Sequence, residues 1–366
     1  MRRCSSLLAA LILLATFSSV LAESPKVRKA QYEKLVARAR GFLRTRQAAD
    51  GSFSKQLGPA ITSLVTTGLI RTGSTNDPMV AKSLKHLEGF IKKDGGIYRK
   101  GSLYRNYETS LAVLCFVEAN KSKSGRYTKT IKRARAFIRG LQWDESEGID
   151  KSSPRFGGAG YGKHRRPDLS NTSYLVEALK GSKDKADQDA IKRAMVFINR
   201  CHNLESPYNT TKFAAKINDG GFYYTPAAGG KSQAGETANG GLRSYASMTY
   251  AGLKSMIYAG VGPNDKRVKA TVSWIKDHYD LKSNPGMGSS GLFYYYQTFA
   301  KALAELKTEV FLDTKGKRHN WKNDLVTELA RRQKANGSWA NKNQRWLESN
   351  PDLVTGYALL ALSYCK

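Results

Sequence analysis

Acidic side chains, histidine and cysteine are all scarce in this chain. It has 30 Asp and Glu residues against 60 Lys and Arg, together with 5 His and 4 Cys. The cysteines show no CxxC spacing and the histidines no helical pair spacing, which disfavours a metal site. The sequence also lacks a Gly-x-Ser-x-Gly nucleophile elbow and a phosphate-binding P-loop. We therefore expect neither a metal nor another cofactor.

Long hydrophobic runs are equally rare, and the clearest one lies at the N-terminus. Met1-Arg2-Arg3 precedes an apolar stretch from Leu7 to Val20, and the small residue Ala22 follows. This order is typical of a secretory signal peptide, and the run is short for a membrane anchor. We expect residues 1–22 to be removed and the mature chain, without a transmembrane segment, to be periplasmic, in the cell envelope or extracellular.

The excess of basic residues gives a formal net charge of +30. Such a field favours anionic partners, of which glycans, lipid or isoprenoid phosphates and nucleic acids are the main classes. Export disfavours nucleic acid. Alternatively, many of the basic residues lie on the solvent-exposed faces of outer helices, as in Lys132-Arg133-Ala134-Arg135, and bind no partner. A protein partner remains a third alternative.

Three cysteines remain after the signal segment, so they cannot all pair. Cys115 sits in the apolar run Leu114-Cys115-Phe116, where a thiol behaves as a small buried hydrophobe. A bridge between Cys201 and Cys365 is left open.

A six-fold repeat is the most informative feature that is present. Each unit has a glycine turn, such as Asp94-Gly95-Gly96 or Asn336-Gly337-Ser338, followed by an apolar helix that opens with small or polar residues. The fifth unit is the weakest, because Gly291-Leu292-Phe293 runs straight into its helix. Recurrence at several tens of residues predicts stacked helical units. The six expected helix starts are Thr62, Thr109, Thr172, Met248, Gln297 and Thr355.

A second, amphipathic and basic helix precedes each glycine turn, as in residues 134–142 and 325–333. The apolar residues of this helix recur at intervals of three and four residues, whereas the helix after the turn is apolar on nearly all sides. This alternation predicts an all-α fold, an (α/α)6 toroid with an inner and an outer ring of six helices each. Strand patterns are nearly absent, with loop hairpins at most around Phe222-Tyr223-Tyr224. We expect one domain over residues 28–366, with long functional or mobile loops at 144–163 and 203–243.

The repeat resembles that of squalene and terpene cyclases and of the β subunits of protein prenyltransferases. In those families the repeat unit has a Gln followed by Gly-x-aromatic. The segment of this chain that matches the unit most closely runs from Leu329 to Trp339, with Gln333 before Gly337-Ser338-Trp339. The resemblance covers essentially the whole mature chain and implies the toroid. It implies less about activity, because one fold hosts many functions.

The catalytic residues of these families do not recur here. Terpene cyclases of class II carry Asp-x-Asp-Asp at the third inner helix, where this chain has Asp168-Leu169-Ser170-Asn171. A serine cannot protonate an alkene, so we expect Ser170 or Asn171 to cap the helix instead. The prenyltransferase zinc positions correspond to Tyr294, Tyr296 and Val354, which cannot form that site.

The first turns of the inner helices and their loops are rich in tyrosine and arginine. If the toroid forms, these side chains converge on a cavity that suits sugar rings, isoprenoid chains, carboxylates or phosphates. Alternatively, the tyrosines fill the barrel and the arginines pair with Glu108, Asp168 and Asp352. The expected cavity residues are Arg105, Tyr107, Tyr161, His164, Arg166, Asp168, Arg243, Tyr245, Tyr294, Tyr296, Gln297 and Asp352.

Two classes of function follow from this sequence, and it leaves catalysis open. One is binding of an anionic or isoprenoid ligand, or of a protein, by a relative without the family's catalytic residues. The other is a divergent enzyme acting on an isoprenoid or on an anionic glycan, as a lyase or hydrolase. Candidate catalytic residues are Asp168, Glu108 and Tyr245, the last with Arg243 beside it in the glycan-cleaving case.

Overall fold

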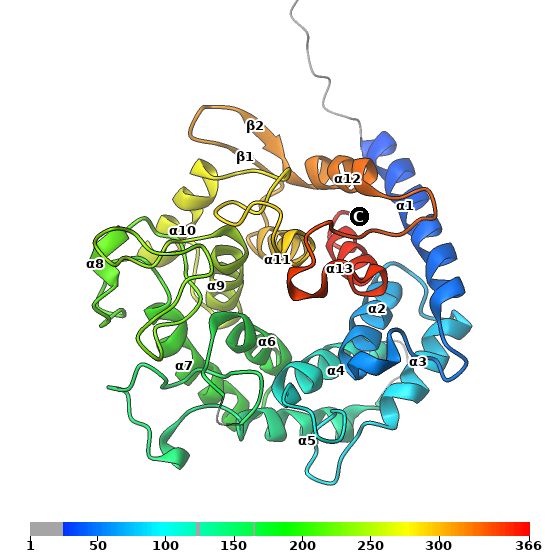
Figure 1. Ribbon diagram of the computed structural model, residues 1–366, viewed down its shortest axis with the longest axis horizontal. Coiled ribbons are helices and arrows are strands. Elements are labelled where there is room, and N and C mark those ends of the chain that lie inside the picture. The colour runs from blue at the N-terminus through cyan, green and yellow to red at the C-terminus, as the bar shows by residue number, and fades with distance from the viewer. Residues whose placement is uncertain (1–24, 122–124, 164) are drawn as a thin grey trace, which may run out of the picture.

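Six helices form a closed inner ring in the computed structural model of the chain, which describes residues 25–121, 125–163 and 165–366. Each inner helix packs against the next, and α13 closes the ring against α2. Figure 1 looks along the axis of this ring. The inner helices are α2 (Pro59–Arg71), α4 (Arg105–Asn120), α6 (Leu169–Leu179), α9 (Ala246–Tyr258), α11 (Leu292–Glu305) and α13 (Pro351–Leu362).

Six further helices surround the inner ring, so the predicted toroid of six helix pairs is confirmed (Figure 1). Their apolar residues are spaced by three and four, as in α5, where Ile131, Ala134 and Ile138 are buried, so that one stripe faces inward. The outer helices are α1 (Pro25–Arg46), α3 (Pro78–Glu88), α5 (Thr128–Arg139), α7 (Lys185–Arg200), α10 (Lys266–Asp277) and α12 (Trp321–Arg332).

In five of the six repeat units, the glycine of the turn lies against an outer helix. Gly157 has φ +79°, and a Cβ there would lie 1.8 Å from the carbonyl oxygen of Arg193 in α7. Only glycine combines this left-handed backbone with such a close approach. Gly51, Gly95, Gly220 and Gly337 lie in the same way against the carbonyls of Lys82, Arg133, Ala270 and Arg38.

Two polar side chains hold the turn at Gly157, and equivalents of one or both recur at other turns. The amide of Gln142 donates to the carbonyls of Gly157 (2.8 Å) and Ala190 (3.0 Å), joining the turn to α7. From the inner side, the hydroxyl of Thr172 accepts the N–H of Ala159 at 3.0 Å. Thr62, Thr109, Thr249 and Thr355 receive equivalent bonds from Phe53, Ile97, Phe222 and Trp339. The repeat is therefore a set of contacts between turn and helix.

The inner helices begin earlier than the sequence predicts. α2 and α13 start at Pro59 and Pro351, because proline suits the first helical position. α6 starts at Leu169, and its cap is Asp168, whose carboxylate accepts the N–H of Asn171 at 2.9 Å. The prediction that Ser170 or Asn171 caps this helix is wrong, since Asp168 already supplies the side-chain acceptor.

Short elements fill the connections. A hairpin of β1 (Val310–Leu312) and β2 (Arg318–Asn320) joins α11 to α12, a pair of strands that the sequence did not predict. Phe222 forms an isolated bridge with His202, in line with the short hairpin expected there. The remaining short helices are η1 (Lys55–Leu57), η2 (Glu145–Glu147), α8 (Ala214–Ile217) and η3 (Arg345–Leu347).

Cys115, Cys201 and Cys365 are all free and buried, so the pairing of Cys201 with Cys365 that the sequence left open does not occur. Across the part of the chain that the structure describes, none of the helices is long and apolar enough to cross a membrane. The expected signal peptide, residues 1–22, lies outside the described residues.

Candidate functional site

A cavity of about 380 Å³ lies at the end of the ring where the inner helices begin. Its wall combines first-turn residues of these helices with residues of the preceding loops. Aromatic rings dominate this wall, and every inner helix or its leading loop contributes to it. The aromatic lining consists of Tyr104, Tyr107, Tyr161, Tyr174, Tyr224, Tyr245, Tyr294, Trp346 and Tyr357.

Hydroxyl groups join the tyrosines across the cavity. The hydroxyls of Tyr107 on α4 and Tyr357 on α13 are 3.2 Å apart, and those of Ser170 on α6 and Tyr294 on α11 are 2.9 Å apart. Burial raises the pKa of Tyr294 and of Tyr245. These phenols therefore stay protonated and present both a ring face and a hydroxyl to a ligand.

Two carboxyl groups, Glu108 and Glu348, line the same cavity. Glu108 accepts the backbone N–H of Arg99 at 3.0 Å, and Glu348 accepts the N–H of Tyr294 at 2.8 Å, in the first turn of α11. Burial raises the pKa of both groups, although their hydrogen bonds favour the ionised form. Each carboxyl thus has a structural role and also faces the cavity.

Asp168 lies just behind the aromatic wall. Its carboxylate accepts bonds from the N–H and the side-chain amide of Asn171, and the hydroxyl of Tyr224 is hydrogen-bonded to it. Burial raises the pKa of Asp168 to about 6, although these hydrogen bonds act to lower it. Because Tyr224 lines the cavity and Asp168 does not, Asp168 contacts the site through that phenol.

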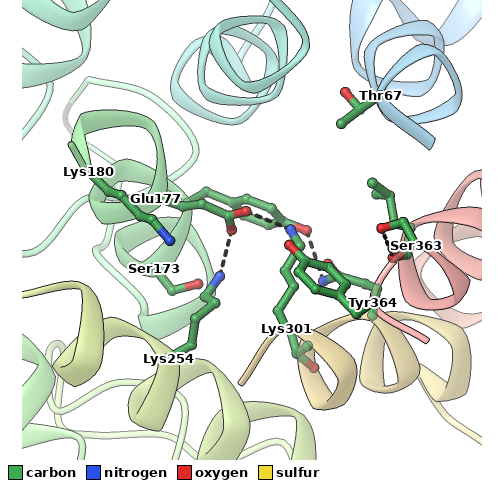
Figure 2. Close-up of polar contacts among 12 residues, drawn as sticks. Thr67, Ser173, Glu177, Lys180, Lys254, Lys301, Ser363 and Tyr364 are labelled. Carbon is green, nitrogen blue, oxygen red and sulfur yellow. Dashed lines mark hydrogen bonds and ion pairs between the residues drawn. The ribbon is translucent and has the colours of Figure 1, made fainter. Parts of the chain in front are cut away.

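A buried ionic cluster lies beneath the cavity, and Tyr174 separates the cluster from the cavity. The ammonium groups of Lys254 on α9 and Lys301 on α11 are each 2.7 Å from the carboxylate of Glu177 on α6 (Figure 2). Both lie within about 6 Å of the ring of Tyr174, close enough for cation–π attraction. The cavity therefore has an aromatic floor above a charged layer on the ring axis.

The charges in this layer perturb one another. Burial opposes the ionisation of Glu177, but Lys254 and Lys301 more than offset it, and the pKa of Glu177 lies below its ordinary value. Burial lowers the pKa of Lys301 to about 8. Arg71 on α2 extends the layer by bonding Glu118 at 2.5 Å and the hydroxyl of Tyr364. The layer thus ties together helices around the ring.

The structure brings several of the predicted site residues together. Of the predicted cavity residues, Tyr107, Tyr161, Tyr245 and Tyr294 line the cavity, and so does the catalytic candidate Glu108. Arg166 is exposed beside it, with its guanidinium 5.8 Å from the centroid of the Tyr224 ring. His164 lies outside the described residues.

The other predicted residues lie elsewhere. Asp352 is buried with Arg46 at 2.9 Å, and Gln297 is buried with its amide 3.4 Å from the hydroxyl of Tyr174. Tyr296 points to the carbonyl of Leu281. Arg105 lies over Tyr98, and Arg243 donates to the carbonyl of Glu236 rather than joining Tyr245. Burial holds the pKa of Tyr245 well above its ordinary value, which disfavours its ionised form as a base.

The predicted set omits several cavity residues, among them Tyr174, Tyr357 and Glu348. Tyr174 and Tyr357 lie one turn deeper in their helices, four residues after the lining residues Ser170 and Leu353. That spacing places each pair on one helix face, a signal that could have identified them. Glu348 lies in an irregular loop. Within the described segments, no three His, Cys, Asp or Glu residues are grouped to hold a metal ion.

Comparisons with known proteins identify the fold and leave the family open. No protein-family model matches the chain, and no curated protein matches it in sequence. Among solved structures, a glycosidase matches with a TM-score of 0.53 at 12% identity, over 91% of this chain and 96% of that one. A polysaccharide lyase matches with a TM-score of 0.53 at 10% identity, over 92% and 96%. At such identities the likeness shows the fold alone.

A glycosyl hydrolase of family 88 from Bacteroides vulgatus matches with a TM-score of 0.52 at 12% identity, over 91% of this chain and 98% of that one. A type II terpene cyclase from Scytonema also matches, at 13% identity, but its TM-score is only 0.32, over 92% and 97%. The toroid that the sequence predicts is confirmed as a fold by the matches with TM-scores above 0.5.

Proposed function

We propose that the central cavity binds a saccharide. The observation that carries this proposal is the wall of eight tyrosines and one tryptophan around a single cavity of about 380 Å³. Aromatic faces pack against the C–H faces of sugar rings, and phenol and carboxylate oxygens hydrogen-bond the sugar hydroxyls. The volume is at the lower end of the range of about 300–1,000 Å³ usual for small-molecule sites.

The polar groups of the wall favour a saccharide over an isoprenoid diphosphate. Of the described cavity residues, Arg99 is the only cation, and Glu108 and Glu348 face the same space. A diphosphate needs several cationic or N–H donors around it, and a single arginine does not supply them. Ser170 occupies the position where an alkene-protonating acid would stand, and Asp168 is turned to Asn171.

The solved structures and the N-terminal segment are consistent with this function. A glycosidase and a polysaccharide lyase share the toroid, so the fold accommodates saccharides at least in those proteins. If residues 1–22 direct export, the mature chain would meet glycans outside the cell. The full chain has 60 basic against 30 acidic residues, and of these only Arg2 and Arg3 lie in residues 1–22, so this charge would suit acidic glycans there.

A second candidate function, cleavage of a glycosidic bond, is favoured by Glu108 and Glu348 facing one cavity with raised pKa values. In such a reaction one carboxylic acid protonates the departing oxygen. The other, as carboxylate, takes a proton from the water that attacks the anomeric carbon. Turnover of glycosides that stops in Glu348→Gln would support this role.

Calorimetric titration of the mature chain with saccharides and with isoprenoid diphosphates, at fixed ionic strength, tests the proposal. We expect saccharide binding that weakens in Tyr357→Phe, which removes only the hydroxyl next to Tyr107. Tyr250→Phe is the matched control, because Tyr250 is a buried inner-helix tyrosine outside the cavity wall. Binding of the diphosphates alone, or equal weakening in both variants, would contradict the proposal.

A further inference from the structure

The loop that leads into α13 presents a strained tryptophan at the mouth of the cavity. Trp346 has φ 55° and ψ 33°, and Leu347 has φ 62°. Bulky residues rarely adopt the left-handed region, so two of them in succession strain the backbone. Trp346 is 43% exposed and Leu347 is 51% exposed, and both residues line the cavity. The strain therefore does not serve to bury these side chains.

Several contacts fix this loop in its strained form. The carboxylate of Glu348 accepts the N–H of Tyr294 at 2.8 Å and the amide of Asn341 at 2.7 Å. The same Asn341 amide donates to the carbonyl of Ser289 at 2.6 Å. The ring of Trp346 lies against Gly291 at the start of α11, where a Cβ would be 3.1 Å from it. The tryptophan is thus held in one place.

Three exposed arginines surround this mouth. The guanidinium of Arg345 lies 4.3 Å from the centroid of the Trp346 ring and donates to Gln233, across the mouth, at 2.5 Å. Arg99 lines the cavity, and Arg166 lies beside Tyr224. The carboxylates of Glu108 and Glu348 are bonded to backbone N–H groups instead of to these arginines. The mouth therefore carries cations that an acidic ligand can reach.

On the basis of the saccharide site proposed above, we infer that Trp346 and Arg345 form a second subsite at the mouth of the cavity. The ligand is then an acidic oligosaccharide. Its terminal ring enters the aromatic cavity, which Tyr174 and the Glu177 cluster close from below. The next ring stacks on Trp346, and its carboxylate pairs with the fork of Arg345. The subsite adds affinity only for ligands longer than one ring.

Isothermal titration of the full mature protein with galacturonic acid, trigalacturonic acid and the neutral trisaccharide cellotriose tests this subsite. We expect the wild type to bind the acidic trimer at least about tenfold more tightly than the monomer. Trp346→Ala should remove most of this difference, because it weakens binding of the trimer far more than binding of the monomer. Arg345→Gln should weaken binding of the acidic trimer but not of cellotriose.

Tyr208→Ala is the matched control. Tyr208 is also an exposed aromatic residue under a stacked arginine, Arg267 at 4.0 Å, but it does not line the cavity. The variants should keep the melting temperature of the wild type, because both rings are exposed. An unchanged ratio of trimer to monomer affinity in Trp346→Ala would overturn the subsite while the cavity stands. Absence of binding by all three saccharides would overturn the cavity proposal together with the subsite.

Discussion

The carboxylate of Glu177 lies 2.7 Å from the ammonium group of Lys254, with both side chains buried on the axis of the ring. Lys301 lies at the same distance from the other carboxylate oxygen. One carboxylate therefore neutralises two cations that are both removed from water. Such an arrangement tolerates the loss of all its charges better than the loss of one.

Removing only the negative charge from this cluster should be strongly destabilising. Glu177→Gln leaves two buried ammonium groups facing each other, and we expect it to lower the free energy of unfolding by about 3–5 kcal/mol. Urea denaturation followed by circular dichroism would measure this loss.

The matched control replaces all three groups, as Glu177→Gln with Lys254→Met and Lys301→Met. Because this variant leaves no buried charge in the triad, it should recover most of the stability. If the triple variant were less stable than Glu177→Gln, the two unpaired ammonium groups would not be the cause of the loss, contrary to our expectation.

Asp168 should make stability depend on pH in a recognisable direction. Its pKa is about 6 in the folded protein, raised from an ordinary value of 3.8. Between these values the folded state binds more protons than the unfolded state, so stability falls as pH rises. Relative to Asp168→Asn, which keeps a capping side chain, the wild type should lose about 2 kcal/mol between pH 4 and pH 7.

Urea unfolding of both proteins at several pH values would show this difference, because other titrating groups largely cancel in the comparison. Parallel curves would mean that Asp168 is ionised throughout this range, with its hydrogen bonds from Asn171 and Tyr224 outweighing its burial.

The repeated glycine turns should be sensitive to a single methyl group. In Gly157→Ala, the new Cβ would meet the carbonyl oxygen of Arg193 at 1.8 Å in a backbone with φ +79°. The turn has to move away from α7, and we expect a loss of at least about 2 kcal/mol. Gly148→Ala is the control, since Gly148 also has a positive φ of +69° but an added Cβ meets no atom within 4 Å. Thermal unfolding should separate the two variants, and equal losses would refute the contact as the cause.

These turns explain why the fold could be predicted from the sequence. Gln142, Gly157 and Thr172 contact one another through one turn, and their equivalents recur along the chain, so a repeat of residue types reports a repeat of contacts. The inner helix starts were predicted late because the cap, as at Asp168, lies outside the apolar run. The hairpin of β1 and β2 was missed because its strands are only three residues long and mostly polar or half-exposed.

The site could be predicted only in part. First-turn residues such as Tyr107 and Tyr294 were identified because a toroid directs first turns to its axis. Tyr174 and Tyr357 were missed because they lie inside apolar runs that resemble core. Asp352 is paired with Arg46, 306 residues earlier in the chain, a long-range contact that no local pattern reveals.

Two tyrosines of α11, Tyr294 and Tyr296, allow the effect of a lost ligand contact to be distinguished from the effect of lost core packing. The sequence places both Tyr294 and Tyr296 in the cavity, but in the structure only Tyr294 lines it, with its hydroxyl 2.9 Å from that of Ser170. Tyr296 is fully buried and bonds the carbonyl of Leu281 at 2.5 Å. Tyr294→Ala should therefore weaken saccharide binding by about tenfold or more, corresponding to about 1.4 kcal/mol, with a smaller loss of stability. Tyr296→Ala should cost about 3–5 kcal/mol of stability and leave the affinity of the remaining folded protein nearly unchanged.

Calorimetric titration together with urea unfolding gives the affinity and the stability of each variant. If Tyr296→Ala weakened binding as much as Tyr294→Ala at temperatures where both are folded, the ligand would lie deeper than the cavity described here.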